Sequence, residues 1–491
     1  MLGLCHSYST LPERFYAQVR PSSVAKPRMI RYNHGLAGEL GPDWSALNEA
    51  DASLVLSGNA VPDGANPIAM AYAGHQFGNF VPQLGDGRAI LLGEVFDIKG
   101  IRRDIQLKGA GRTPYSRGGD GRAALGPVLR EYLVSEAMHA MGIPTTRALA
   151  AVMTGDPVYR ETPLPGAVLT RVAASHIRVG TFQFFAARGD TEGSKALADY
   201  VIDRLYPEIK GSDAPYLALL NAVATRQASL IADWLRIGFI HGVMNTDNSA
   251  ISGETIDFGP CAFMEAYNPV TVFSSIDRNG RYAYQNQPGM AQWNMARLAE
   301  TLLPLIDEDQ ERAVELANEA VIAFAETFNA SWLSGMRRKL GLRLEEDGDR
   351  ALIDGFLNVL LVNRADFTLA FRRLSDAAEG IENESQFHDL MAEDRMAAVE
   401  WLESWRARLA REAMSGEARA RAIRAVNPIY IPRNHLIEEA IQAATQGADF
   451  APFEALCGVL ADPFREDADV SVRYTLPAEP NERVTQTFCG T

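Results

Sequence analysis

The sequence predicts an α+β fold built from about two or three structural units. Three observations support this prediction. The chain has 491 residues, which is more than a single hydrophobic core usually holds. Short apolar runs separated by glycines gather in its first third, and apolar residues recur at helical spacing over most of the remainder. With 47% apolar and 22% charged residues, the composition is that of an ordinary globular protein.

Strands are expected early in the chain, after an irregular segment over 1–60 that holds only short elements. Ile105 and Leu107 alternate with polar residues, which places them on one face of a strand over 104–108. Two other apolar regions predict strands, at 89–95 and within 148–172. A loop rich in glycine and arginine is expected at 109–122.

Helices are expected in most of the remainder. Leu129, Leu133 and Ala137 recur along one side of a predicted helix over 125–141, and Gly142 suits its end. Further helical periodicity is found at 194–206, 214–238, 310–335 and 351–375. The last residues, from about 466, are polar, and we expect them to be extended.

Charge and cysteine content exclude several classes of function. The chain carries 47 Lys and Arg against 62 Asp and Glu, a net charge of −15, which argues against nucleic acid as the main partner. No run approaches the roughly 20 apolar residues that cross a bilayer, and no basic-then-apolar secretory signal opens the chain. The four cysteines are far apart, without a C-x-x-C motif, so neither a disulfide scaffold nor a zinc site is expected. We expect a cytoplasmic enzyme that contacts no membrane.

The most informative motif lies between 241 and 259. Asn248 follows His241 by seven residues, and the triplet Asp257-Phe258-Gly259 begins nine residues after that Asn. This is the spacing of a protein-kinase catalytic centre, in which the Asn and the Asp hold metal ions on the phosphates of a nucleotide. Asn248 and Asp257 would supply the oxygen ligands that Mg²⁺ or Mn²⁺ takes. The spacing predicts a protein-kinase-like fold of two lobes.

The motif departs from the kinase pattern at the catalytic base. A kinase has its base two residues after the His, where this chain has Val243, and valine cannot accept a proton. Asp247 is the nearest carboxylate and is our candidate for the base. The alternative is that Asp247 only orients Asn248. His241 is expected to pack under the loop rather than to bind or react.

Two groups of residues are candidates for contacting phosphates. Gly85-Asp86-Gly87-Arg88 combines a cationic side chain with glycines, whose backbone N–H groups can approach a phosphate closely. A hairpin turn is the alternative for this segment. Arg171 and Arg178 would hold terminal phosphates by paired hydrogen bonds, with ordinary surface charge as the alternative.

Lys108 ends a predicted strand, as the phosphate-binding lysine of a kinase does. In a kinase this lysine pairs with a Glu of the following helix, and here Glu131 is a better candidate than Glu136 because it lies about two turns into the predicted helix. The alternative is a solvated lysine at the end of a strand.

The predicted lobes define five parts of the chain. They are an N-terminal extension (1–60), an N-lobe (61–165), a C-lobe with the catalytic and metal-binding loops (166–300), a large helical C-terminal region (301–465) and a flexible tail that contains Cys489 (466–491).

Five segments carry a more specific signal: 72–78 (YAGHQFG), 83–89 (QLGDGRA), 106–117 (QLKGAGRTPYSR), 241–248 (HGVMNTDN) and 257–261 (DFGPC). In these segments the chain resembles the selenoprotein O family of kinase-like protein adenylyltransferases. The resemblance covers most of the chain. It implies transfer of AMP from ATP to Ser, Thr or Tyr hydroxyl groups of proteins (AMPylation), with pyrophosphate as the leaving group. It also implies a nucleotide that lies flipped relative to a kinase, so that the α-phosphate faces the acceptor.

The resemblance assigns roles to individual residues. Asp247 would accept the proton, Asn248 and Asp257 would hold Mg²⁺ or Mn²⁺, and Glu131 would be structural. The nucleotide would be contacted by Gly85, Gly87, Arg88, Lys108, Asp120, Gly121, Arg171, Arg178 and Asp257. The implied partners are ATP and protein substrates, with redox-related or metabolic enzymes among them, and we expect a monomer.

Three alternatives stay open for the activity. They are a kinase that transfers the γ-phosphate with an unusual base, an enzyme that transfers UMP with Mn²⁺, and an inactive nucleotide-binding pseudokinase scaffold. The presence of Lys108, Glu131, Asn248 and Asp257 argues against the scaffold, because degenerate kinase relatives usually lack one of these residue types.

A redox role follows from the resemblance. Many animal members of the family carry selenocysteine near the C-terminus, and the corresponding residue here is Cys489. Cys261 lies four residues after Asp257. We expect Cys489 to form a reversible disulfide with Cys261 that regulates the active site. The alternative is two unpaired thiols.

Overall fold

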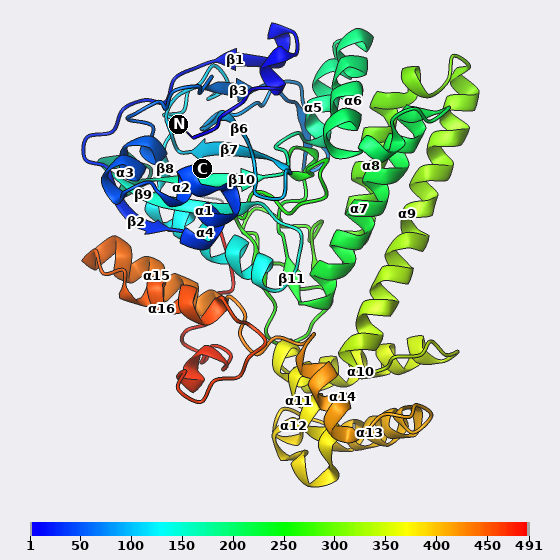
Figure 1. Cartoon of the computed structure of the whole chain (residues 1–491). Coiled ribbons are helices and arrows are strands. Elements are labelled where there is room, and N and C mark those ends of the chain that lie inside the picture. Colours follow the sequence, from blue (N-terminus) through cyan, green and yellow to red (C-terminus); the bar gives the residue numbers. More distant parts are fainter. Residues whose placement is uncertain (1, 489–491) are drawn as a thin grey trace.

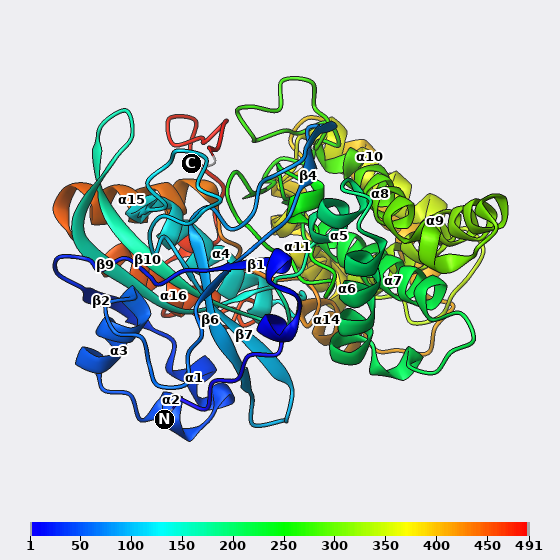
Figure 2. The ribbon, with the colours of Figure 1, turned by 90° about the horizontal axis from the view of Figure 1, so that it is seen from above.

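The computed structural model describes residues 2–488. Strands gather in the N-terminal half of the chain, and helices form most of the remainder (Figure 1). Seen from above, the strands and the long helices lie side by side (Figure 2). The predicted mixture of α and β structure is therefore confirmed.

An antiparallel sheet of eight strands forms the centre of the first part. Seven strands follow the order β1-β3-β6-β7-β10-β9-β2, and β8 pairs with β10. The strands are β1 (Tyr16–Gln18), β2 (Arg28–Tyr32), β3 (Ile68–Met70), β6 (Ala89–Phe96), β7 (Arg102–Lys108), β8 (Ala123–Ala124), β9 (Arg147–Tyr159) and β10 (Pro163–Ala173). The strands predicted at 89–95, 104–108 and within 148–172 are confirmed.

Residues 1–60 are more regular than expected. Tyr16 of β1 pairs with Met70 of β3, and Arg28 of β2 pairs with Met153 of β9, so this segment supplies both ends of the sheet. It also contains three helices, α1 (His34–Leu40), α2 (Pro42–Ser45) and α3 (Glu49–Ser57). The short elements expected in this segment are present, but the segment is less irregular than predicted, because the partners that order it lie far away in the sequence.

Alternation along β7 sorts its side chains between the two faces of the sheet. Ile105 and Leu107 are buried in one hydrophobic cluster with residues of α1, α2 and α3. Gln106 and Lys108 point to the other face, where α4 (Leu125–Ala140) packs. The predicted helix over 125–141 is thus confirmed, and Lys108 and this helix face each other.

The long helices stand beside the sheet. They are α5 (Val179–Ala186), α6 (Thr191–Leu205), α7 (Pro215–Arg236), α8 (Gln287–Ile306) and α9 (Gln310–Lys339). The helices predicted at 194–206, 214–238 and 310–335 are confirmed. Between α7 and α8 lies a long segment with one small sheet, β11 (Phe239–Ile240) and β12 (Ala262–Phe263). Another hairpin, β4 (Gly74–Gln76) and β5 (Asn79–Val81), lies apart from the main sheet.

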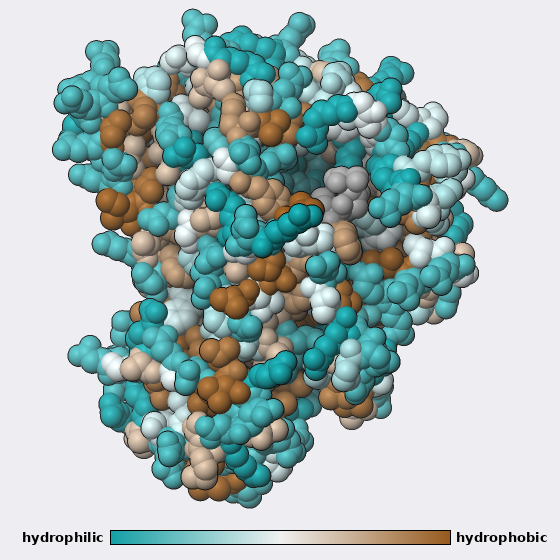
Figure 3. Space-filling model, turned by 180° about the vertical axis from the view of Figure 1, so that it is seen from behind, coloured by the Kyte–Doolittle hydropathy of each residue, from teal (hydrophilic) through white to brown (hydrophobic). Residues whose placement is uncertain are grey.

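A second group of helices forms the lower part of the molecule, which is also visible from behind (Figure 3). It contains α10 (Asp349–Asn363), α11 (Phe367–Glu379), α12 (Ser385–Asp389), α13 (Arg395–Leu409) and α14 (Gly416–Arg424). The periodic stretch 351–375 is divided between two helices. Arg364 has a left-handed backbone (φ 48°) that ends α10, and the Asp366 side chain accepts a hydrogen bond from the Leu369 N–H at 2.8 Å to begin α11.

The last two helices, α15 (Asn434–Gly447) and α16 (Ala451–Leu460), return to the sheet and pack against α4. Phe453 is fully buried, and its ring centroid lies 5.7 Å from that of Tyr132 on α4. Arg130 of α4 forms an ion pair with Glu438 of α15. These contacts fix α4 from the side opposite the sheet.

The segment expected to be a flexible tail is held at several points in its described part, 466–488. The Ala478 N–H donates to the Glu265 carboxylate at 3.1 Å. Thr487 pairs with Ser274 in a parallel bridge, and its hydroxyl donates to the Pro260 carbonyl at 2.5 Å. Within residues 2–488, no helix combines the length and the apolar character needed to cross a membrane.

We predict that Phe453→Ala loosens α4. Removing a buried Phe ring costs about 3–5 kcal/mol, and we expect the loss to appear as faster amide hydrogen exchange in peptides from 125–140, measured by mass spectrometry. Phe96→Ala is the matched control, because Phe96 is 55% exposed and its loss should cost less than about 1 kcal/mol. Unchanged exchange in α4 would show that α16 does not hold it.

Candidate active site

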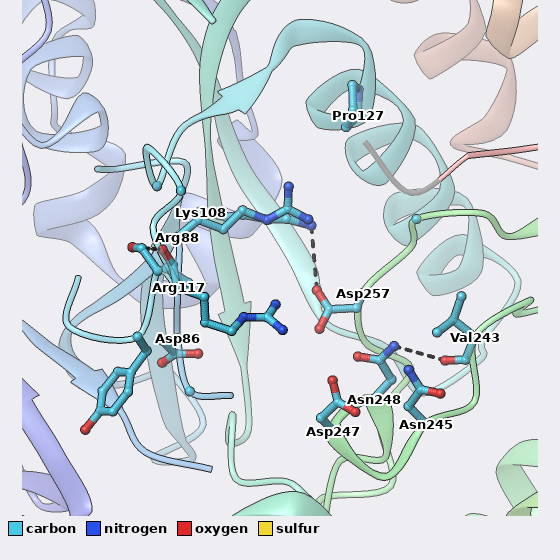
Figure 4. Close-up of a pocket in the computed structure, with 18 of the residues that line it drawn as sticks. Asp86, Arg88, Lys108, Arg117, Pro127, Val243, Asn245, Asp247, Asn248 and Asp257 are labelled. Atoms are coloured by element: carbon cyan, nitrogen blue, oxygen red, sulfur yellow. Dashed lines mark hydrogen bonds and ion pairs between the residues drawn. The ribbon is translucent and has the colours of Figure 1, made fainter. Parts of the chain in front are cut away.

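A cavity of about 450 Å³ opens between the sheet and the loops that precede α8. Arg88 and Lys108 lie on its sheet side, and Asp247, Asn248 and Asp257 face them from the opposite loop (Figure 4). The volume falls within the range of small-molecule sites. The structure therefore brings the two separate groups of predicted site residues together.

The cavity is rich in positive charge although the chain as a whole is acidic. Seven cationic side chains line it: Arg88, Lys108, Arg117, Arg122, Arg160, Arg171 and Arg178. Five carboxylates line it as well: Asp86, Asp120, Glu131, Asp247 and Asp257. A local excess of cations in a cleft attracts a polyanion such as a nucleotide phosphate chain.

Asp257 stands at the centre of these charges. Its backbone is left-handed, with φ 63°. One carboxylate oxygen lies 2.6 Å from Arg178 Nη1, and the other forms an ion pair with Arg171 and lies 3.6 Å from Lys108 Nζ. Burial opposes the charged form, but the attraction of these three cations outweighs it, so the pKa of Asp257 lies well below its usual range.

Lys108 makes the ion pair that the sequence predicts. Its Nζ lies 2.5 Å from a Glu131 oxygen, and Arg171 Nε lies 2.5 Å from the other oxygen of the same carboxylate. Glu136 pairs with Arg147 instead. The alternative of a solvated lysine is therefore wrong.

The two arginines are not surface charges. Arg171 is 2% exposed and Arg178 is 3% exposed. Arg178 also donates to the backbone carbonyl of Asp247 at 2.5 Å. It thereby joins the two aspartates of the loop 241–259, which we call the motif loop.

Asp247 has the opposite electrostatic environment to Asp257. One of its oxygens accepts a hydrogen bond from Gln76 Nε2 at 3.1 Å, and the other, Oδ1, has no hydrogen-bond partner among the described residues. Burial raises the pKa of Asp247 to about 6, and Arg178 and Gln76 offset only part of this effect. A buried carboxylate with one unpartnered oxygen is suited to accepting a proton.

Asn248 is held independently of the Asp247 side chain. Its Nδ2 donates to the Val243 carbonyl at 2.9 Å, and within the described residues no hydrogen bond joins it to the Asp247 carboxylate. This geometry does not support the alternative in which Asp247 only orients Asn248. Val243 itself contributes only backbone and apolar contacts at the site.

The glycine segment Gly85–Arg88 lines the cavity, and its contact with phosphates stays a prediction. It joins no pair of neighbouring strands, so it is not a hairpin turn. The N–H of Gly87 donates to the Gly85 carbonyl at 2.8 Å, so that group is not directed at a ligand. The glycines instead make room for Tyr115, since a Cβ at Gly85 would overlap its ring and a Cβ at Gly87 would lie 2.9 Å from its carbonyl oxygen.

Asp120 and Gly121 line the outer rim of the cavity. Asp120 forms an ion pair with Arg160 at 2.8 Å, which contributes to lowering the pKa of Asp120. Gly121 has φ 68°, and a Cβ there would overlap the backbone of Gly111. Their closeness to a bound nucleotide remains a prediction.

Several polar residues that line the cavity are absent from the predicted set, among them Tyr72, Gln76, Arg117 and Asn245. All four belong to the segments that carry the family resemblance, so the signal was present in the sequence. Spacing alone did not reveal the roles of Tyr72, Gln76 and Asn245, because each contacts a partner in another segment. Gln76, for example, acts through Asp247.

His241 is structural, as expected. It is fully buried, its ring stacks on Trp234 with centroids 5.3 Å apart, and its Nε2 lies 2.8 Å from the Ile256 carbonyl oxygen. Cys261 is also fully buried, and burial raises the pKa of its thiol to about 12. Cys489 lies outside the described residues, so its disulfide with Cys261 stays a prediction.

Residues 2–461 match the family model of protein adenylyltransferase SelO. The chain belongs to the SelO family. The protein nucleotidyltransferase YdiU of Rhizobium meliloti (strain 1021) is 63% identical over 486 residues, which cover 99% of both chains. Its namesake from Bradyrhizobium diazoefficiens is 61% identical over 99% of this chain and 98% of the relative. The one from Agrobacterium fabrum is 60% identical over the full length of both chains. The resemblance to the selenoprotein O family is confirmed.

We predict that Asp247 of this SelO-family protein titrates near pH 6. Carboxyl-carbon NMR of protein labelled at aspartate should show a resonance with a midpoint near 6 that disappears in Asp247→Asn. Gln76→Leu removes a hydrogen bond to the charged form and should raise that midpoint further. A midpoint below pH 4 would contradict the environment described for Asp247.

Proposed function

We propose that this SelO-family protein is a nucleotidyltransferase that moves AMP from ATP to Ser, Thr or Tyr hydroxyl groups of other proteins. The observation that carries the proposal is the position of Asp247, a buried carboxylate with an unpartnered oxygen at the edge of a cationic cavity. The family is named for protein adenylyl transfer and its YdiU relatives for protein nucleotidyl transfer. Both names support the proposal.

In this reaction the acceptor hydroxyl gives its proton to Asp247. The hydroxyl oxygen then forms a bond to the α-phosphorus, and the bond from that phosphorus to the oxygen bridging to the β-phosphate breaks. Pyrophosphate leaves with the electron pair. A pKa of about 6 leaves Asp247 mostly deprotonated at neutral pH and therefore able to act as a base.

The cations around Asp257 suit the leaving group. Lys108, Arg171 and Arg178 are buried and preorganised by ion pairs, so they would stabilise negative charge on the phosphates without large reorganisation. Arg88 lies on the same side of the cavity (Figure 4) and would contact the phosphates too.

The site also fits a divalent cation. Within residues 2–488, no group of three or more His, Cys, Asp or Glu side chains is placed to hold a metal ion by itself. Mg²⁺ usually takes one or two protein ligands together with water and substrate phosphates. Asn248 and Asp257 supply that smaller set, and the low pKa of Asp257 keeps it charged. Bound Mg²⁺ or Mn²⁺ would neutralise charge on the phosphates.

We further propose that the molecule has the two-lobe plan of a protein kinase. The sheet with α4 would be the N-lobe (61–165, completed by strands from 1–60), and α5 to α8 with the motif loop would be most of the C-lobe (166–300). The cavity between them supports a two-lobe plan. The boundaries predicted at 165 and 300 need correction, because β10 belongs to the sheet as far as Ala173 and α8 continues to Ile306. The helical region 301–465 and the tail would then lie outside this two-lobe core.

The direct test uses ATP labelled at either the α- or the γ-phosphate, with Mg²⁺ or Mn²⁺ and a protein acceptor. We expect label on the acceptor from α-labelled ATP only, because pyrophosphate carries the γ-label away. Label from γ-labelled ATP only would identify a kinase instead. A parallel reaction with α-labelled UTP would reveal UMP transfer.

We predict that Asp247 is needed for turnover but not for ATP binding, and that Asp257 is needed for ATP binding. Asp247→Asn should lower kcat about 10²–10⁴-fold and leave the Kd for ATP nearly unchanged, whereas Asp257→Ala should abolish metal-dependent ATP binding, measured by calorimetry. The wild-type kcat/KM should fall about tenfold per pH unit below about pH 6, where Asp247 is protonated. Equal loss of binding in both variants would refute the base assignment.

A further inference from the structure

The acceptor hydroxyl has to reach Asp247, so the walls next to that residue decide what can bind there. Gln76, which donates to Asp247, lines the cavity on this side together with Phe77 and Asn245, which are hydrogen-bonded to each other. Ile276 of the loop 266–286 also lines the cavity, and Lys108 and Arg88 line the side opposite Asp247 (Figure 4). An acceptor therefore approaches over the β4–β5 hairpin and the loop 266–286. This inference rests on the proposed function.

Hydrogen bonds join the two sides of that approach. Asn245 Oδ1 accepts hydrogen bonds from the Phe77 N–H at 3.0 Å and the Tyr282 hydroxyl at 2.7 Å, which ties the hairpin to the loop. Gly74 faces Asp247, and a Cβ there would lie 2.8 Å from its unpartnered oxygen. A glycine at this position lets the buried Asp247 carboxylate pack closely against the hairpin.

The loop beside this approach carries unbalanced positive charge. Arg278 and Arg281 form no ion pair with any other described residue. The nearest carboxylate in the loop, Asp277, is buried and accepts the N–H groups of Arg281 at 2.9 Å and Tyr282 at 2.8 Å. Arg281 lies against the β4–β5 hairpin, since a Cβ at Gly78 would lie 3.7 Å from its guanidinium carbon, and Arg278 is an exposed residue of the same loop.

Apolar groups flank these charges. Ile276 is 58% exposed and lines the cavity, and Phe80 in β5 of the hairpin is 40% exposed. The Arg281 guanidinium lies 4.9 Å from the ring centroid of Trp293. His75 lies between Trp293 and Phe80, since its ring centroid is 5.2 Å from that of Trp293 and 5.0 Å from that of Phe80.

We propose that Phe80, Ile276, Arg278, Arg281 and Trp293 form an acceptor surface. It binds a segment of the substrate protein that carries Asp or Glu residues together with an apolar residue close to the modified hydroxyl. Charge complementarity selects the acidic residues, because a guanidinium binds a carboxylate through two parallel hydrogen bonds. Arginine and tryptophan on such a surface also dominate binding energy in many protein complexes.

The test compares two synthetic peptides with the same central tyrosine and neighbouring leucine, one flanked by aspartates and the other by lysines. AMP incorporation from α-labelled ATP measures turnover, and fluorescence anisotropy of the labelled peptides measures binding without turnover. We expect the wild type to prefer the acidic peptide by about tenfold or more in both measurements. The double variant Arg278→Glu, Arg281→Glu should lose this preference or invert it, while its Kd for ATP stays within about twofold of the wild type.

Arg395→Glu is the matched control. Arg395 is an exposed arginine at the start of α13 and makes no ion pair with the described residues, so the same change of charge there should leave the peptide preference intact. Equal use of both peptides by the wild type, or an unchanged preference in the double variant, would overturn the acceptor surface. Transfer to both peptides with equal efficiency would leave the nucleotidyltransferase activity established. Absence of any AMP transfer, self-labelling included, would overturn the proposed function and the acceptor surface with it.

Discussion

The structure depends on one buried cluster of charges. Lys108 from β7, Arg171 from β10 and Arg178 before α5 share the carboxylates of Glu131 on α4 and Asp257 in the motif loop. Buried charges are costly unless they are paired, so removing one member leaves others uncompensated. The cluster therefore fixes the sheet, α4 and the motif loop relative to one another, and it holds three cations where phosphates would bind.

Two aspartates only ten residues apart acquire opposite properties from this arrangement. Asp257 faces three cations and stays charged, whereas Asp247 is buried with fewer compensating groups and has a raised pKa. Pairs of carboxylates whose pKa values are pushed apart are typical of enzymes that need one charged ligand and one proton acceptor. The pair can divide these tasks because Arg178 holds the Asp257 side chain but only the backbone carbonyl of Asp247.

Two other parts of the chain hold the active site in place. Helices α15 and α16 return from the C-terminus to pack on α4, which carries Glu131. Hairpin β4–β5 is anchored to the motif loop, where the His75 N–H donates to the Thr246 hydroxyl at 2.7 Å, and it brings Gln76 to Asp247. Helices α15 and α16 fix the nucleotide side of the cavity. The β4–β5 hairpin shapes the side from which a protein acceptor would approach.

The sequence by itself determined the local elements and the identities of the central residues. Period-two alternation fixed the face of Ile105 and Leu107, and the offsets from His241 identified Asn248 and Asp257, because such signals depend only on near neighbours. Tertiary structure decided the rest. Whether Arg171 is a surface charge or a buried ligand of Glu131 depends on strand pairing and helix packing between segments 40 residues apart. The raised pKa of Asp247 likewise depends on burial by distant segments, which no local pattern encodes.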